Sequence, residues 1–382
     1  MDVSLNILHF LCLLLSSSLL SNAQIIEFPV ANLSTKWINR PLLDNSPLPS
    51  LNSSNWAGLK IILLRESVGP CFVCGFLCQF ENGTCFFTVS IFQARPSSSN
   101  YTFIQAPEVV WTANRNTPVK INATLQLSQE GDLILKDADG SYVWSTSTTG
   151  KSVSGLNLTE EGNLVLIGQN NAVVWQSFDH PTDSLLPWQI PPSGKKLIAN
   201  ESATNMSEGL FSIVYKDVGF VASVESNPPQ IYYQSQDPIT IDSIQEYMDG
   251  SLPSQFTRFG SDGHLRVYEW TGSDWKQHSD LLGSSPCDYP FVCGNYSICS
   301  NGQCSCLGAD GTTTFFRQVD GGQPNLGCTA ITPLACNSSQ SQSFLEIWDL
   351  YYIAFSIDII YTDKETCKLA CLKNCSCKLA LF

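Results

Sequence analysis

Between about residues 103 and 176, apolar and polar positions alternate in short runs that repeat along the chain. Leucines at every second position, as at Leu125 and Leu127 and again at Leu133 and Leu135, predict short antiparallel strands that each bury one face. A glycine-containing turn separates the two runs, as expected of a hairpin. The pattern returns 31 residues later, and the matching pairs are Leu125/Leu156, Leu127/Leu158, Gly131/Gly162, Asp132/Asn163, Leu133/Leu164, Leu135/Leu166 and Trp144/Trp175.

A third tryptophan extends the repeat towards the N-terminus. Trp111 lies 33 residues before Trp144, at the end of a similar apolar run. One hairpin unit cannot bury its apolar face alone, whereas three units arranged about an axis can enclose their aromatic side chains in a common core. We therefore expect a mainly β fold, a threefold β-prism with Trp111, Trp144 and Trp175 near its centre.

The N-terminus carries a second apolar pattern. Residues 7–20 are almost wholly apolar, and Ser21, Asn22 and Ala23 follow them. This arrangement predicts a signal peptide over residues 1–23, because the run is shorter than a membrane span requires. An uncleaved anchor is the alternative.

Cysteine usage points to the secretory route. Of 16 cysteines only Cys12 lies in the signal, and the odd number that remains implies one thiol without an intramolecular partner. The first four can be read as a zinc site, but two disulfides are the favoured interpretation in an oxidising compartment. The cysteines expected in disulfides are Cys71, Cys74, Cys78, Cys85, Cys287, Cys293, Cys299, Cys304, Cys306, Cys328, Cys336, Cys367, Cys371, Cys375 and Cys377.

Glycosylation sequons and the net charge narrow the class of partner. A net charge of −14 does not provide the basic surface that nucleic acid or anionic lipid requires. Each sequon that is used must lie at the surface, because a glycan is too bulky and polar to bury. The sequons are at Asn32, Asn52, Asn82, Asn100, Asn122, Asn157, Asn200, Asn205, Asn295, Asn337 and Asn374.

Three phrases carry a resemblance to a known family. Residues 109–115 (VVWTANR), 162–166 (GNLVL) and 174–183 (VWQSFDHPTD) resemble the bulb-type mannose-binding lectin domain of the plant S-domain, or G-type lectin, receptor-like kinases. The resemblance implies a β-rich S-domain segment, an EGF-like module and a PAN/apple module downstream. The expected organisation is signal peptide 1–23, bulb-type lectin domain 24–176, S-domain-like β segment 177–285, EGF-like module 286–329 and partial PAN/apple module 336–382.

The later cysteines and strands agree with this order. Six cysteines between Cys287 and Cys328 need cross-links, because so short a segment cannot build a sufficient core. The sequence alone leaves their pairing open, whereas the resemblance implies Cys287–Cys299, Cys293–Cys304 and Cys306–Cys328. Strands are predicted at residues 214–215, 231–233 and 264–270.

A helix is predicted near the C-terminus. Thr362 and Glu365 have the spacing of a capping box, and Cys367 and Cys371 then share one face of the helix. The run CKLACLKNCSC at residues 367–377 resembles the PAN helix of the same receptors. The family's sixth cysteine would lie beyond Phe382, so truncation is the simplest explanation of the odd thiol.

The mannose-binding pattern of bulb lectins, QxDxNxVxY, is degenerate here. It aligns with Ser128, Glu130, Asp132, Ile134 and Lys136, and again with Thr159, Glu161, Asn163, Val165 and Ile167. Only Asn163 and Val165 match, and each lost directional partner removes about 1 kcal/mol. The favoured interpretation is strands that keep the fold without the sugar site. The candidate carbohydrate residues are nevertheless Glu130, Asp132, Ile134, Glu161, Asn163 and Val165.

No catalytic set stands out in the chain. Asp179, His180 and Asp183 form a tempting acid-base group, yet they belong to a phrase shared with non-enzymatic lectins. The kinase motifs GxGxxG, His-Arg-Asp and Asp-Phe-Gly are absent from these 382 residues. We therefore expect no catalytic residue, no cofactor and no metal.

The expected function is extracellular recognition. We expect a secreted, apoplastic ectodomain that binds a glycan, a cell-wall component or a receptor ectodomain, with a disulfide or PAN-mediated dimer as a further partner prediction. One alternative is the extracellular part of a plasma-membrane receptor serine/threonine kinase whose remaining domains lie beyond residue 382. Another alternative is a passive cell-wall glycoprotein.

Overall fold

The structure, a computed structural model, is mainly β. It describes residues 27–41, 56–66, 71–79, 83–96, 101–103, 107–190, 192–216, 219–235, 255–283, 285–308, 315–331, 344, 346–348, 350, 363–374, 377 and 380. The chain divides into two compact units, residues 1–180 with 270–275 and residues 181–269 with 276–382. Within the described residues, no helix has the length and apolar character needed to cross a membrane.

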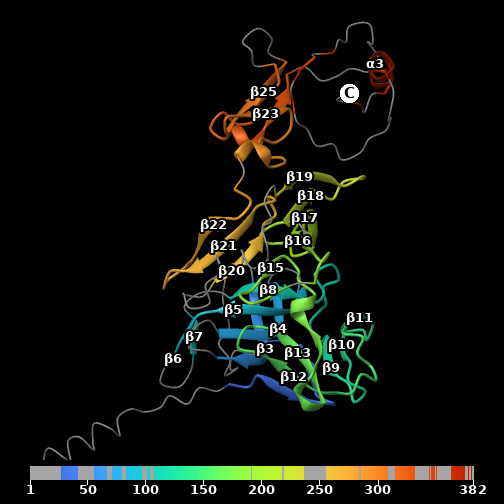
Figure 1. The fold of residues 1–382 in the computed structure, drawn as a ribbon, viewed down its shortest axis with the longest axis vertical. Coiled ribbons are helices and arrows are strands. Elements are labelled where there is room, and N and C mark those ends of the chain that lie inside the picture. The colour runs from blue at the N-terminus through green and yellow to red at the C-terminus, as the bar shows by residue number, and fades with distance from the viewer. Residues whose placement is uncertain are drawn as a thin grey trace, which may run out of the picture. The chain divides into compact units, whose positions relative to one another are not determined.

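Three four-stranded antiparallel sheets form the first unit (Figure 1). The β4 sheet consists of β3 (Trp56–Arg65), β4 (Cys71–Gln79), β5 (Cys85–Phe92) and β8 (Glu108–Thr112), in that order. The β10 sheet consists of β11 (Tyr142–Ser145), β10 (Leu133–Lys136), β9 (Thr124–Leu127) and β2 (Lys36–Ile38). The β13 sheet consists of β1 (Val30–Asn32), β12 (Val153–Leu158), β13 (Leu164–Gly168) and β14 (Val173–Gln176). A separate hairpin joins β6 (Ala94–Pro96) and β7 (Tyr101–Phe103).

Strand register confirms the 31-residue repeat. In the β10 sheet Leu135 lies opposite Leu125 and Trp144, and the register shifts immediately after Leu135. In the β13 sheet Leu166 lies opposite Leu156 and Trp175, with the same shift immediately after it. The inward leucines of both sheets are fully buried. The two sheets are therefore copies of one unit, built by the same alternation of apolar and polar residues.

The three tryptophans meet at the centre of this unit, as the repeat predicts. The ring centroids of Trp111, Trp144 and Trp175 lie 5.8, 5.9 and 5.8 Å apart, and each pair packs edge to face. Edge-to-face packing contributes about 0.5–1.5 kcal/mol per pair beyond the burial of area. Phe87 adds a fourth ring, 6.1 Å from Trp111 and 6.2 Å from Trp144.

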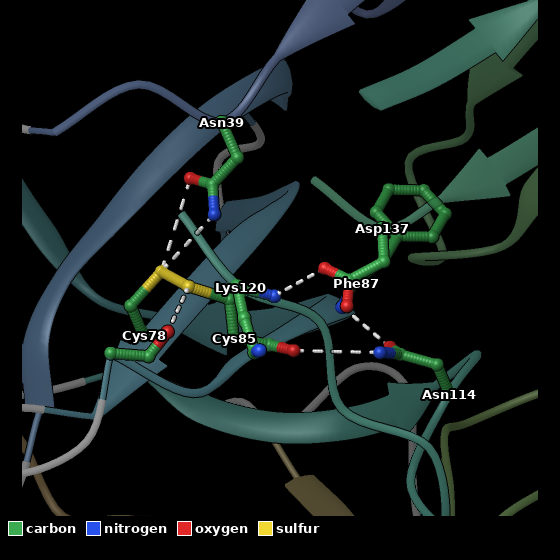
Figure 2. Close-up of a disulfide and its surroundings, with 8 residues drawn as sticks. Asn39, Cys78, Cys85, Phe87, Asn114, Lys120 and Asp137 are labelled. Atoms are coloured by element: carbon green, nitrogen blue, oxygen red, sulfur yellow. Dashed lines mark hydrogen bonds between the residues drawn. A yellow bond between two sulfur atoms is a disulfide. The ribbon is translucent and has the colours of Figure 1, made fainter. Parts of the chain in front are cut away.

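A cross-strand disulfide joins the ends of β4 and β5 (Figure 2). Cys78 and Cys85 are direct partners, and their Cα atoms lie 4.0 Å apart. The backbone N–H and C=O of Cys85 both bond to Val119, so the cysteine pair is of the non-hydrogen-bonded kind, in which side chains approach closely. The buried Asn39 donates its side-chain amide to Cys78 Sγ at 3.5 Å.

Two disulfides were expected among Cys71, Cys74, Cys78 and Cys85, and only Cys78–Cys85 forms between these described residues. Cys71 and Cys74 lie three residues apart on β4, so their side chains point to opposite faces of the sheet. Cys74 keeps its thiol and is fully buried. Because Cys78 and Cys85 are already joined, the expectation of a second bond within the four was wrong.

Two further four-stranded sheets form the body of the second unit. One consists of β16 (Lys196–Asn200), β17 (Glu208–Lys216), β18 (Gly219–Val224) and β19 (Gln230–Gln234). The other consists of β15 (Ser184–Leu185), β20 (Gln255–Phe259), β21 (Leu265–Trp270) and β22 (Trp275–Asp280). The predicted strands at residues 214–215 and 231–233 lie in β17 and β19, and the one at 264–270 corresponds to β21, which begins one residue later. Phe211, Phe220 and Phe259 lie in their shared core.

Residues 286–330 form a small cross-linked module. Two hairpins pair β23 (Ser297–Ser300) with β24 (Gln303–Cys306) and β25 (Phe316–Gln318) with β26 (Cys328–Ala330). The disulfides are Cys287–Cys299, Cys293–Cys304 and Cys306–Cys328, the same three pairs that the resemblance implies.

The C-terminal helix begins one residue later than the capping box predicts. Helix α3 (Lys364–Lys373) has Asp363 as its N-cap, and the Asp363 carboxylate accepts a hydrogen bond from the Thr366 N–H. A carboxylate is a stronger acceptor for the exposed N–H groups than a threonine hydroxyl. Cys371 bonds to Cys377. The cysteines Cys336 and Cys375 lie outside the described residues, and the pairing of Cys367 stays a prediction.

Candidate carbohydrate-recognition faces

The residues that align with the sugar-binding pattern lie on the two copied hairpins. Each hairpin begins with a hydroxyl side chain that accepts a backbone hydrogen bond four residues on. Ser128 Oγ accepts from the Asp132 N–H, and Thr159 Oγ1 accepts from the Asn163 N–H, both at 3.2 Å. The position that holds glutamine in the sugar pattern therefore stabilises a turn in both copies.

Asp132 is turned inwards. Its side chain is 6% exposed, and Oδ1 accepts hydrogen bonds from Thr146 Oγ1 at 2.8 Å and from the Thr148 N–H at 3.1 Å. Thr146 Oγ1 also accepts from the Leu133 N–H. Asp132 thus joins the start of β10 to the segment that follows β11.

Asn163 has the equivalent role in the second copy. Its Oδ1 accepts from Ser177 Oγ at 3.2 Å and from the Phe178 N–H at 3.3 Å, and its Nδ2 donates to Gln176 Oε1 at 2.9 Å. Ser177 Oγ accepts from the Leu164 N–H, as Thr146 does from Leu133 in the first copy. Both polar ends of the Asn163 amide are engaged within the protein.

The other candidate residues divide between turns and the outward faces of the sheets. Glu130 and Glu161 are exposed in the hairpin turns. Ile134 is half-buried on the outward face of the β10 sheet, and Val165 holds the equivalent place on the β13 sheet, where it is 4% exposed. The structure therefore does not bring the six candidates together as one polar site.

The two outward faces differ in chemistry. On the β10 sheet the side chains opposite the leucine core include Lys36, Gln126, Lys136 and Tyr142, all exposed. On the β13 sheet the positions related by the repeat and by strand pairing are Val30, Asn157, Ile167 and Val173.

Two sequons lie on the β13 sheet. Asn32 is exposed on β1, and Asn157 is half-buried on β12. Arg65 donates to Asn157 Oδ1 at 3.3 Å and to the Leu158 carbonyl at 3.0 Å, and it pairs with Glu27 at 2.6 Å.

The acid-base group considered from the sequence has structural contacts. His180 stacks on Trp175 with ring centroids 5.4 Å apart, and its carbonyl accepts from Trp111 Nε1 at 2.8 Å. Asp179 accepts from Gln176 Nε2 at 2.9 Å. Asp183 is 4% exposed and accepts from Asn200 Nδ2 at 2.9 Å. Each side chain thus supports the backbone or the core around it.

In the part of the chain that the structure describes, no three His, Cys, Asp or Glu side chains are grouped to hold a metal ion. Burial raises the pKa of the Cys74 thiol well above its usual range. A thiol in that environment stays protonated and is a poor metal ligand or nucleophile.

A known protein family matches part of this chain. Residues 108–213, from β8 into β17, match the D-mannose binding lectin family. The chain carries a bulb-type lectin domain. Strands β8 to β14 of the Trp-centred prism, including both copied hairpins, lie within the matched residues, and so does the degenerate sugar pattern.

Curated relatives of this chain include glycoproteins, one of them named as secreted, and receptor-like kinases. EP1-like glycoprotein 2 of Arabidopsis thaliana is 32% identical over 257 residues, which cover 51% of this chain and 56% of the relative. The epidermis-specific secreted glycoprotein EP1 of Daucus carota is 31% identical over 258 residues, 51% of this chain and 66% of the relative. A putative G-type lectin S-receptor-like serine/threonine-protein kinase of Arabidopsis thaliana is 28% identical over 361 residues, 78% of this chain and 41% of the relative. The chain thus spans about half the length of the curated relatives that it matches.

Proposed function

We propose that this chain is a non-catalytic extracellular recognition protein that binds a glycan through the outward faces of its lectin prism. The prism, the cross-linked module, the sequons and a relative named as a secreted glycoprotein support this proposal. The Asp179, His180 and Asp183 side chains are occupied with structural contacts, which supports a binding role over an acid-base one.

The internal use of Asp132 and Asn163 is the observation that carries the proposal. A side chain whose acceptor already takes two protein hydrogen bonds is a poor partner for a sugar hydroxyl. The outward side chains of the β10 sheet remain exposed, including Gln126 and Lys136. Recognition therefore uses the surface of the sheet, and simple mannose is a weak ligand.

The proposed organisation keeps the expected segments. Residues 24–176 are the lectin domain, 177–285 the S-domain-like β segment, 286–329 an EGF-like module and 336–382 a partial PAN/apple module. The three disulfides between Cys287 and Cys328, and the bond from Cys371 on α3 to Cys377 beyond the helix, support the last two assignments.

A second candidate function is the extracellular part of a membrane receptor kinase. The match to the kinase relative extends over 78% of this chain, beyond the lectin domain, and favours this candidate. Both candidates share the same recognition role for the residues described here. Sequencing the transcript past the codon for Phe382 separates them, because a kinase continues into an apolar span and a catalytic domain.

The test of recognition is equilibrium binding of the glycosylated, secreted full chain to an immobilised panel of neutral and acidic cell-wall oligosaccharides. We expect saturable binding to at least one class of oligosaccharide and, at most, millimolar affinity for free mannose. Absence of saturable binding across the panel would instead favour the passive glycoprotein. An Asn163→Ala variant is unsuitable as the binding probe, because the hydrogen bonds to Ser177 and Phe178 make it a stability variant.

A further inference from the structure

We infer that the outward face of the β10 sheet binds a carboxylate-bearing, acidic oligosaccharide. This inference rests on the proposed glycan recognition and names the class of ligand. Its basis is a juxtaposition of exposed side chains that strand pairing brings together from β2, β9, β10 and β11.

Two rows of side chains cross this face. Strand pairing aligns the first row across all four strands, and its members are Lys36, Gln126, Ile134 and Ser145. The second row is offset from the first by two residues on β2, β9 and β10 and by three on β11, where the register shifts, and its members are Ile38, Thr124, Lys136 and Tyr142. Leu125 and Leu135 between the rows are fully buried, which fixes these side chains on the opposite, outward surface. The face therefore has an aliphatic centre flanked by amide, hydroxyl and ammonium groups.

The two lysines give the face its charge. Lys36 and Lys136 are exposed, and within the described residues neither makes an ion pair. From strand spacing, their Cα atoms lie about 12 Å apart across the intervening strand β9. In a chain of net charge −14, a sheet face with two unpaired ammonium groups runs against the overall charge. Such a local positive potential attracts an anion.

The acidic residues nearest to Lys136 in sequence are committed to the β10–β11 turn. Asp137 Oδ1 accepts from the Lys120 and Ala138 N–H groups, both at 2.7 Å. Asp139 accepts from the Ser141 N–H at 2.8 Å, and hydrogen bonds from Ser141 lower the pKa of this carboxyl. These carboxylates bond to turn N–H groups and make no ion pair with Lys136 among the described contacts.

Tyr142 supplies a surface suited to a sugar ring. Its side chain is 63% exposed, and its hydroxyl donates to Ser145 Oγ at 2.8 Å. Because Ser145 is three residues further along the same strand, this bond lays the phenol along β11. An aromatic ring held in this way offers an apolar face with a polar tip, at little cost in side-chain entropy.

The second copy of the unit provides an internal comparison. At the positions equivalent to Lys36, Lys136 and Tyr142, the β13 sheet has Val30, Ile167 and Val173. Its outward face also carries the sequons at Asn32 and Asn157. The Arg65 guanidinium that bonds to Asn157 is paired with Glu27 and adds no net charge to this face. The same fold therefore presents one cationic face and one face without unpaired charge on its strands, and only the cationic face matches a carboxylated ligand.

The test compares a soluble oligouronate with its methyl-esterified, uncharged form, each titrated into the full secreted chain by calorimetry. We expect the oligouronate to bind at least about tenfold more tightly than the ester, and more weakly as salt rises, because exposed charge pairs are screened. Lys36→Gln combined with Lys136→Gln should weaken oligouronate binding by about tenfold, as two exposed ion pairs predict. The matched control, Lys151→Gln with Lys195→Gln, makes the same change of charge at exposed positions elsewhere and should leave binding unchanged.

A second pair of variants tests the aromatic platform. Tyr142→Ala should weaken binding, whereas Val173→Ala at the equivalent position of the β13 sheet should not. Equal affinity for the oligouronate and its ester, or unchanged affinity in the Lys36 and Lys136 double variant, would overturn the inference. If a neutral glycan from the panel binds and the oligouronate does not, this inference fails while the proposed function stands. If no glycan binds, the proposed function fails as well.

Discussion

The hydrogen bonds of Asp132 lead to a prediction that separates a structural role from a ligand-binding one. Asp132→Ala removes the acceptor of the Thr146 hydroxyl and the Thr148 N–H, which lie in a buried segment. At about 1–1.5 kcal/mol for each of these two hydrogen bonds, the free energy of unfolding of the lectin domain should fall by about 2–3 kcal/mol. For a domain of this size, that corresponds to a decrease in Tm of about 4–12 °C.

The conservative variant Asp132→Asn should behave differently. All the hydrogen bonds of this carboxylate go to Oδ1, which an asparagine retains. The second copy of the unit already has Asn163 at the equivalent position, where its Oδ1 accepts from Ser177, the equivalent of Thr146, and from the Phe178 N–H. We therefore expect Asp132→Asn to cost less than about 1 kcal/mol.

Urea unfolding monitored by tryptophan fluorescence is the appropriate assay, because Trp111, Trp144 and Trp175 lie together in the prism core. Glu130→Ala, an exposed position of the same hairpin, is the matched control and should change stability by less than about 0.5 kcal/mol. If Asp132→Asn were as destabilising as Asp132→Ala, the negative charge and not the Oδ1 acceptor would be the stabilising feature, and the argument from the repeat would be wrong.

Three further predictions follow from other parts of the fold. Trp175→Ala should cost about 3–5 kcal/mol in urea unfolding, because it leaves a cavity between Trp111 and Trp144; a cost below 1 kcal/mol would exclude a shared tryptophan core. Burial works to raise the pKa of Asp262, but the Arg266 guanidinium, which bonds both carboxylate oxygens, lowers that pKa overall. The stability that this pair contributes should be present above the ordinary pKa of 3.8 and be lost as the pH falls below it. As the pH is lowered, the urea midpoint of an Asp262→Asn variant should therefore decrease less than that of the unaltered chain. Cys74 should resist alkylation in the native chain and react after denaturation, as mass spectrometry of the tryptic peptide can show.

Much of the prism can be predicted from the sequence, because its information is local. The leucines at alternate positions specify which face of each strand is buried, and the 31-residue spacing specifies that β9–β11 and β12–β14 are copies. The three tryptophans, one from each unit, are then expected to pack together in a common core. The pairing of Cys287 with Cys299 and its two neighbours followed from the family resemblance and not from local pattern.

The role of the site residues was harder to predict, since it depends on contacts between distant positions. The partners of Asp132 lie 14 and 16 residues further along the chain, and nothing at Asp132 itself distinguishes an inward carboxylate from a sugar ligand. The cationic face is also not evident from motif matching, which aligns Lys136 with the sugar pattern but gives no link to Lys36. Lys36 on β2 and Lys136 on β10 share one face only because β9 pairs with both β2 and β10.

The early cysteines show a different kind of error. Strand alternation alone places Cys71 and Cys74 on opposite faces of β4, so this spacing argued against a bond between them. The helix cap was misplaced by one residue because Thr362 and Asp363 are both good N-caps, and the choice depends on where the chain enters α3.

The measurement that tests the central claim most directly is a hydrogen-exchange footprint of the full chain with and without saturating oligouronate. We expect new protection of backbone amides from Thr124 to Ser145, in the three β10-sheet strands that carry Gln126, Lys136 and Tyr142, and little change in the equivalent strands of the β13 sheet. Protection confined to the cross-linked residues 286–330, with the β10 sheet unchanged, would contradict the assignment of recognition to the lectin prism.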